Sequence, residues 1–169
     1  MGQSGSRLDR FAGAAEAAGA TVHRVGPTEA APTLETVVEA PAVGVPLDLE
    51  GVELPPAVET AVAHDRVRAA RTGVTPAVLG VVEHGSVAVE TGASGAGAAS
   101  TYPERHVAVL RESALVPDLP SALEALGPRL GNGGDVVLVA APSATADMGE
   151  TVRGVHGPAE LHLVVVGDG

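Results

Sequence analysis

Two valine-rich runs near the C-terminus constrain the fold of this chain more than any other feature. The first covers residues 136–140 and the second residues 161–166. Short apolar runs without alternating polar positions are typical of central strands that are covered on both faces of a sheet. The polar segment between them, from Ser143 to Gly157, predicts a turn, a short helix and a second turn. The first turn follows the carboxyl end of a strand, where open α/β sheets bind their ligands.

The rest of the chain alternates between helical and strand patterns, which predicts an α/β fold with a mostly parallel sheet flanked by helices. Helices are expected over residues 7–18, 28–38, 57–71 and 120–126, and strands over residues 21–25, 43–45 and 105–110. Two further β-rich runs flank residues 83–86, as in a hairpin. A loop of small residues covers residues 91–100. Residues 1–6 are expected to form a disordered lead, and residues 7–169 a single domain.

The charge and residue content of the chain exclude several kinds of function. The net charge is −11 and all ten basic residues are arginine, so we expect no binding to nucleic acid. The acidic residues are scattered, which favours adaptation to high salt over a dedicated site for a basic partner. The chain has no cysteine, which excludes disulfides and iron–sulfur clusters held by cysteine. Without a signal core or a run of roughly 18 apolar residues, we expect a cytoplasmic protein with no membrane span.

Polar residues beside the apolar runs are the candidate site residues. Glu83, between a strand and a glycine, is a candidate base or nucleophile, and the alternative is a turn acid in water. Ser143, Thr145 and Asp147 lie where a helix is predicted to begin, and they either cap it or help to bind an anion. His156 is a candidate acid, base or ligand, and the alternative is a hydrogen bond to a turn carbonyl.

Three further features have structural explanations at least as good as functional ones. Gly92, Gly95 and Gly97 follow a strand, but their spacing is not that of a phosphate-binding loop and the chain has no lysine. The backbone N–H groups of this loop are still able to hold an anion. His106 and His162 lie in strand patterns and are expected to be structural. No H-E-x-x-H spacing occurs, so no metal site is expected.

Four short motifs occur in the order that is found in one known family. They are Glu83-x-Gly85-Ser86, Pro103-x-x-His106, Pro142-Ser143-x-Thr145-x-Asp147 and Gly154-x-His156-Gly157-Pro158. This series resembles the LUD domain of lactate-utilization proteins, and above all its LutC/YkgG branch, over residues 70–166. The resemblance implies an α/β fold of the NagB/RpiA/CoA-transferase type. With the residues singled out above, it predicts Glu83 and His156 as catalytic groups and a ligand site made of Gly85, Ser86, Ser143, Thr145, Asp147 and Gly157.

The function that the resemblance implies is an accessory role in the oxidation of L-lactate to pyruvate. The partners would be LutA-like and LutB-like iron–sulfur proteins, because this chain has no cysteine to hold a cluster. The ligand would be a small carboxylate or a nucleotide-like molecule; no cofactor is specified, and self-association into a homo-oligomer stays open. Two alternatives also stay open. One is a stand-alone enzyme of the same fold, for CoA or acyl transfer with Glu83 as nucleophile or for isomerisation, and the other is a ligand-binding module without catalysis.

Overall fold

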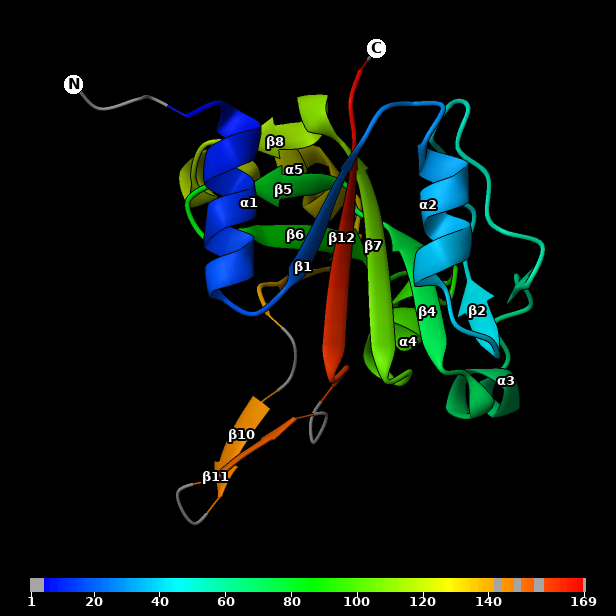
Figure 1. The fold of residues 1–169 in the computed structure, drawn as a ribbon. Helices are drawn as coiled ribbons and strands as arrows, with labels where there is room; N and C mark the ends of the chain where they lie inside the picture. The colour runs from blue at the N-terminus through cyan, green and yellow to red at the C-terminus, as the bar shows by residue number, and fades with distance from the viewer. Residues whose placement is uncertain (1–4, 142–143, 148–149, 154–156, 169) are drawn as a thin grey trace.

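A six-stranded parallel sheet forms the centre of the computed structural model, which describes residues 5–141, 144–147, 150–153 and 157–168 (Figure 1). The strand order is β1-β12-β7-β4-β2-β3. The strands are β1 (Thr21–Val25), β12 (Glu160–Val166), β7 (Arg105–Arg111), β4 (Thr72–Pro76), β2 (Ala42–Gly44) and β3 (Val58–Glu59). The second valine-rich run therefore forms a central strand, β12, as predicted.

Both faces of this sheet are apolar, and helices cover both (Figure 1). On one face α2 (Ala30–Val37) packs Leu34 among the valines of β7 and β12. On the other face α1 (Arg7–Ala17) packs Phe11 against Leu110 and Leu163. Two short helices, α3 (His64–Ala69) and α4 (Ala96–Thr101), complete the layers beside β2 and β4.

A smaller four-stranded sheet packs on the α1 face. Its order is β8-β5-β6-β9, with β8 (Leu115–Val116), β5 (Leu79–Val81), β6 (Ser86–Glu90) and β9 (Val136–Val139). Strands β5 and β6 form the predicted antiparallel hairpin. A 3₁₀ turn (Glu112–Ala114) precedes β8, and α5 (Leu119–Gly131) covers the outer face through Ala122 and Leu126. Asp118 caps α5, because its side chain accepts a hydrogen bond of 2.9 Å from the Ser121 N–H.

The prediction that the first valine-rich run is a central strand is wrong. In the described part of the chain β9 pairs only with β6, at the edge of the small sheet. Val137 and Leu138 are 49% and 41% exposed. A short apolar run fits an edge strand as well as a central one, because its position depends on where the other strands pair.

The helix predicted after Ser143 is also wrong within the described residues. Strands β10 (Ala144–Asp147) and β11 (Glu150–Arg153) form an antiparallel hairpin there. Thr145 pairs with Val152, and such β-branched residues favour strands over helices. Thr145 and Asp147 therefore do not begin a helix.

Three other boundaries differ from the prediction. The helix expected over residues 57–71 shrinks to α3, preceded by β3, because Val67 is its only buried residue and a single apolar contact cannot hold a long helix. The loop of small residues contains α4. Ser6, which was predicted to lie in a disordered lead, caps α1, because its hydroxyl accepts a hydrogen bond of 3.1 Å from the Asp9 N–H.

Candidate functional site

The turn between β5 and β6 carries the first predicted site residues, and they differ in exposure. The Glu83 side chain is 57% exposed, and its carboxylate lies 3.9 Å from Nδ1 of His84. Gly85 and Ser86 are buried. Gly85 has a φ of +64°, and a Cβ there would lie 2.1 Å from the Ala15 backbone nitrogen. The packing of this turn against α1 therefore explains Gly85 without any ligand.

The small sheet brings Ser86 next to the polar segment that was predicted to bind a ligand. Val87 pairs with Val139, the last residue of β9, so the chain leaves β9 beside Ser86. Ser143 and His156 lie outside the described residues. For Thr145 and Asp147 only the backbone, in β10, is described. Gly157 lies in a bend just before β12.

His106 lies on β7 and is fully buried. Its Nε2 is 2.9 Å from the Thr75 hydroxyl, whereas its Nδ1 has no hydrogen-bond partner among the described residues. His106 stands in register beside Leu161, which packs with Val87 and Val139, so this imidazole faces the small sheet. Burial lowers the pKa of His106 to about 4, so the ring is neutral at physiological pH. The hydrogen bond of Nε2 fits the predicted structural role. The lack of a partner for Nδ1 among the described residues was not predicted.

A network of ion pairs lies at the amino ends of β4, β7 and β12. Arg105, whose side chain is only 12% exposed, lies 2.9 Å from Glu39 and 2.6 Å from Glu160. Arg71 is 3.0 Å from Glu39. The hydrogen bond from Arg71 and the charge of Arg105 lower the pKa of Glu39. Burial alone would raise the pKa of Glu160, but the hydrogen bond and charge of Arg105 lower it. The network thus keeps both carboxylates ionised and joins the strand ends.

Two stacked histidines continue this network. Nε2 of His23 lies 3.0 Å from Nδ1 of His162, and the rings are 5.3 Å apart between centroids. Burial lowers the pKa of both rings. Nε2 of His162 is 3.5 Å from Glu160. Within the described ranges, no three His, Asp or Glu side chains are arranged to hold a metal ion. His162 thus contacts both His23 and Glu160.

A cavity of about 610 Å³ lies at the carboxyl ends of β2 and β4. Its walls come from loop 45–49, from residues 76–78 after β4, and from the end of β6 with the glycine-containing loop 92–96. Glu90 and Arg129 line it and form an ion pair at 3.4 Å. Among the described residues, the predicted Glu83, Gly85, Ser86 and Gly157 are not part of its walls. Ser86 lies at the other end of β6 from Glu90, roughly 13 Å away for four strand residues.

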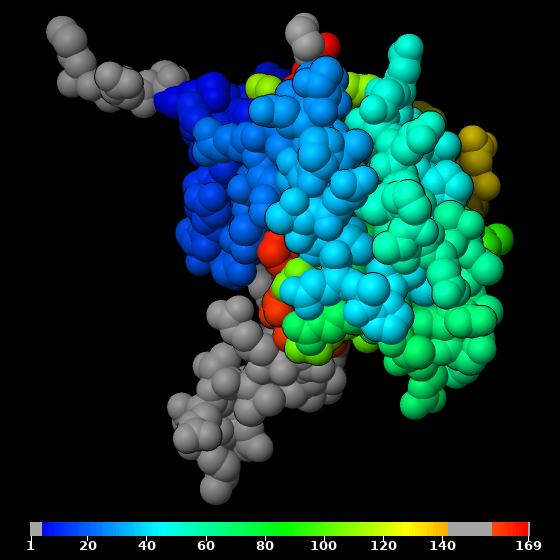
Figure 2. All heavy atoms as spheres, turned by 45° about the vertical axis from the view of Figure 1, so that its right-hand side comes forward, coloured from blue at the N-terminus to red at the C-terminus, as the bar shows by residue number. Residues whose placement is uncertain are grey.

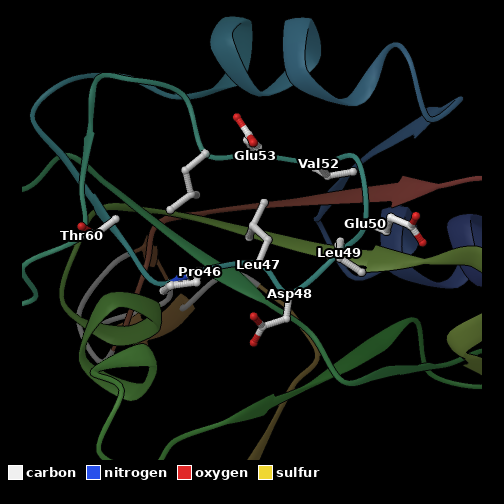
Figure 3. A pocket seen from close by; sticks show the side chains of 9 residues that line it. Pro46, Leu47, Asp48, Leu49, Glu50, Val52, Glu53 and Thr60 are labelled. Carbon is white, nitrogen blue, oxygen red and sulfur yellow. The ribbon is translucent and has the colours of Figure 1, made fainter.

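The segment that follows α2 forms one wall of this cavity, and it is drawn in cyan to teal at the surface in Figure 2. Residues of the same segment line a neighbouring open pocket of about 500 Å³ (Figure 3). Figure 3 shows Leu47 pointing into that neighbouring cavity and the Asp48 carboxylate pointing away from Glu53. Asp48 lines both cavities. The only sequence signal for this region was the group of glycines after β6.

Comparison with known proteins identifies the family. The profile of the LUD domain matches residues 56–166, which include all four motifs and the strands from β3 to β12. This chain belongs to the LUD-domain family. The resemblance found in its motifs is therefore confirmed.

One sequence relative and one solved structure are similar to this LUD-domain chain. It is 31% identical to lactate utilization protein C of Deinococcus radiodurans over 112 residues, which are 64% of this chain and 52% of that protein. The chain thus spans about half the length of this curated relative. Its fold matches the crystal structure of a DUF162 family protein from the same organism with a TM-score of 0.75, at 22% identity. That match covers 95% of this chain and 96% of the other, and it supports the predicted α/β fold.

No helix in the described ranges is both long enough and apolar enough to cross a bilayer.

Proposed function

We propose that this LUD-domain protein acts in lactate utilization as a LutC-like accessory subunit in the oxidation of L-lactate to pyruvate. The observation that carries the proposal is the 31% identity to a lactate utilization protein C over 112 residues, together with the match of the LUD domain to residues 56–166. The chain has no cysteine, so the redox clusters would belong to LutA-like and LutB-like iron–sulfur partners. The relation to this relative supports a shared role in lactate use, and the partner proteins are part of the proposal.

The proposed ligand site lies where the polar segment leaves β9 beside the β5–β6 turn. Ser86 is buried there, and His106, whose Nδ1 has no hydrogen-bond partner among the described residues, lies on the sheet face that packs against the small sheet. A small carboxylate is the proposed ligand, since hydroxyl, imidazole and backbone N–H groups all donate hydrogen bonds to carboxylates. The proposed site is made of Gly85, Ser86, Ser143, Thr145, Asp147 and Gly157, with Glu83 and His156 as its acid–base groups.

The accessory role fits Glu83 better than the stand-alone transferase does. A carboxylate nucleophile is activated by a desolvated or charged environment. Glu83 is 57% exposed, and its carboxylate lies 3.9 Å from the ring of the neighbouring His84. The structure thus offers Glu83 no such environment in the described residues.

The partner claim is tested by purifying the tagged full-length protein from cells grown on L-lactate. Iron–sulfur proteins should co-purify in a stable ratio, with the visible absorbance of their clusters, and they should be absent from cells grown without lactate. Purification of the chain alone from lactate-grown cells would overturn the proposed subunit role.

The site claim is tested by thermal shift with L-lactate and pyruvate. Either ligand should raise the melting temperature of the natural protein, and Ser86→Ala should reduce this shift. Ser113→Ala, on the exposed 3₁₀ turn, is the control and should keep the full shift. An identical shift in both variants would place the ligand elsewhere.

A further inference from the structure

The cavity at the carboxyl ends of β2 and β4 is not used by the proposed function. We propose that it is a second binding site, and that its ligand is a nucleoside monophosphate or a cofactor that contains one. The inference rests on the volume, the polar groups and the loop of this cavity, and it does not depend on the role in lactate oxidation. Its place agrees with the general rule that open α/β sheets bind ligands beyond the carboxyl ends of their strands.

The volume of the cavity favours a ligand much larger than lactate. It holds about 610 Å³, within the roughly 300–1,000 Å³ of sites that take drug-sized molecules. A three-carbon acid would leave most of that space to water. Val45 and Leu47, both nearly fully buried, and Val78 provide an apolar wall for a flat ring. No aromatic residue lines the cavity, so aliphatic contacts rather than stacking would hold the base.

The polar groups of the cavity match a sugar with one phosphate. Asp48 and Glu90 are hydrogen-bond acceptors, which suits the two hydroxyl donors of a ribose. Arg129 presents the guanidinium donors that bind phosphate, and its ion pair with Glu90 at 3.4 Å holds it at the cavity. Two carboxylates and one guanidinium leave a net charge of −1. This local charge favours a monophosphate over a triphosphate.

The loop after β6 allows the phosphate to come close to the backbone. Residues 92–94 line the cavity, and no hydrogen bond among the described residues uses their N–H groups. A Cβ on Gly92 would meet no atom within 4 Å, so the backbone is open on that side. Free backbone N–H groups beside an arginine supply donors for phosphate oxygens.

The test is isothermal titration of the full-length protein with AMP, GMP, CMP and UMP. At least one should bind saturably with one site per chain, and ATP without a divalent cation should bind more weakly. Arg129→Gln should weaken binding of the best ligand about tenfold, which is the loss of one charge-assisted hydrogen bond. Ala93→Trp, at an exposed position that lines the cavity, should weaken it at least as much by filling the space.

Arg68→Gln is the matched control, because Arg68 is an exposed arginine on α3 outside the cavity. It should bind the nucleotide as the natural protein does, and circular dichroism should show all three variants folded. Absence of saturable binding for all four monophosphates at millimolar concentration would overturn the proposal. Binding in the Arg129→Gln and Ala93→Trp variants that is as tight as in the natural protein would also overturn it. Neither result bears on co-purification with iron–sulfur proteins or on growth with lactate, so the two proposals fail separately.

Discussion

The stability of this protein should fall as the pH drops from about 6.5 to about 4, because His106 is held neutral in the core. Its ordinary pKa is 6.5, and burial lowers the folded-state pKa to about 4. Between these two pKa values His106 is protonated in the unfolded chain and neutral in the folded chain. The unfolded state therefore binds more protons, and the free energy of unfolding decreases as the pH falls. The contribution of His106 is fully present above pH 6.5 and is lost by about pH 4.

The size of this loss follows from the shift in pKa. Each pH unit between the two values costs about 1.4 kcal/mol, so the interval costs about 3 kcal/mol. Such a loss is a large part of the 5–15 kcal/mol that typically stabilises a domain. Carboxylates in ion pairs become protonated in acid and also lower the stability of the protein, so the contribution of His106 must be measured by comparison with a variant.

Urea unfolding followed by circular dichroism, at several pH values and constant salt, makes this comparison. His106→Gln cannot take up the proton, so its free energy of unfolding should fall about 3 kcal/mol less over the interval than that of the natural protein. His64→Gln is the control, because His64 is exposed on α3, and it should show the natural slope. A His106→Gln protein that is folded and keeps the natural slope would refute the reasoning.

Three further predictions concern the turn, the ion-pair network and the acidic surface. Gly85→Ala should lower the free energy of unfolding in urea by more than about 2 kcal/mol, because the backbone of Gly85 is left-handed and Ala15 leaves no room for a Cβ. Gly13→Ala, on the exposed side of α1, should instead raise it by about 0.5–1 kcal/mol. Equal urea midpoints for the two variants would contradict this. Arg105→Gln should lower the free energy of unfolding, because Glu39 and Glu160 each lose a charged partner, whereas Arg68→Gln should stay within about 0.5 kcal/mol of the natural protein; a change as small in Arg105→Gln would deny the network a role. Removing molar salt should lower the melting temperature, since the net charge of −11 is then unscreened; identical melting curves would count against adaptation to salt.

Local patterns were sufficient for the elements that carry strong signals of their own. The strands over residues 21–25 and 105–110 and the turn over residues 83–86 occur where predicted. Their turn residues and β-branched runs act over a few positions, so no distant contact is needed to recognise them. The helix capped by Asp118 also begins where predicted, although α5 extends to Gly131, beyond the predicted end at residue 126.

Pairing between distant elements was not predictable in the same way. The run at residues 136–139 is as apolar as a central strand, yet β9 becomes an edge because it pairs with β6 in a separate sheet. The hairpin of β10 and β11 replaces a predicted helix because cross-strand pairing outweighs weak local preferences. In both cases the deciding neighbour lies on another element.

The candidate site was only partly predictable for the same reason. The order of the motifs led to the family, whereas the position of the site beside Ser86 and the end of β9 stays a prediction. The roles of Glu83, His156 and the other motif residues stay predictions. Asp48 and Arg129 line one cavity although they lie some eighty residues apart in the sequence, and no sequence motif indicates that their segments come together.

Growth on L-lactate tests the central claim most directly. A strain that lacks this gene should fail to grow on L-lactate as sole carbon source, grow normally on pyruvate, and recover when the intact gene is restored. Growth of the deletion strain on L-lactate at the natural rate would contradict a role in lactate oxidation.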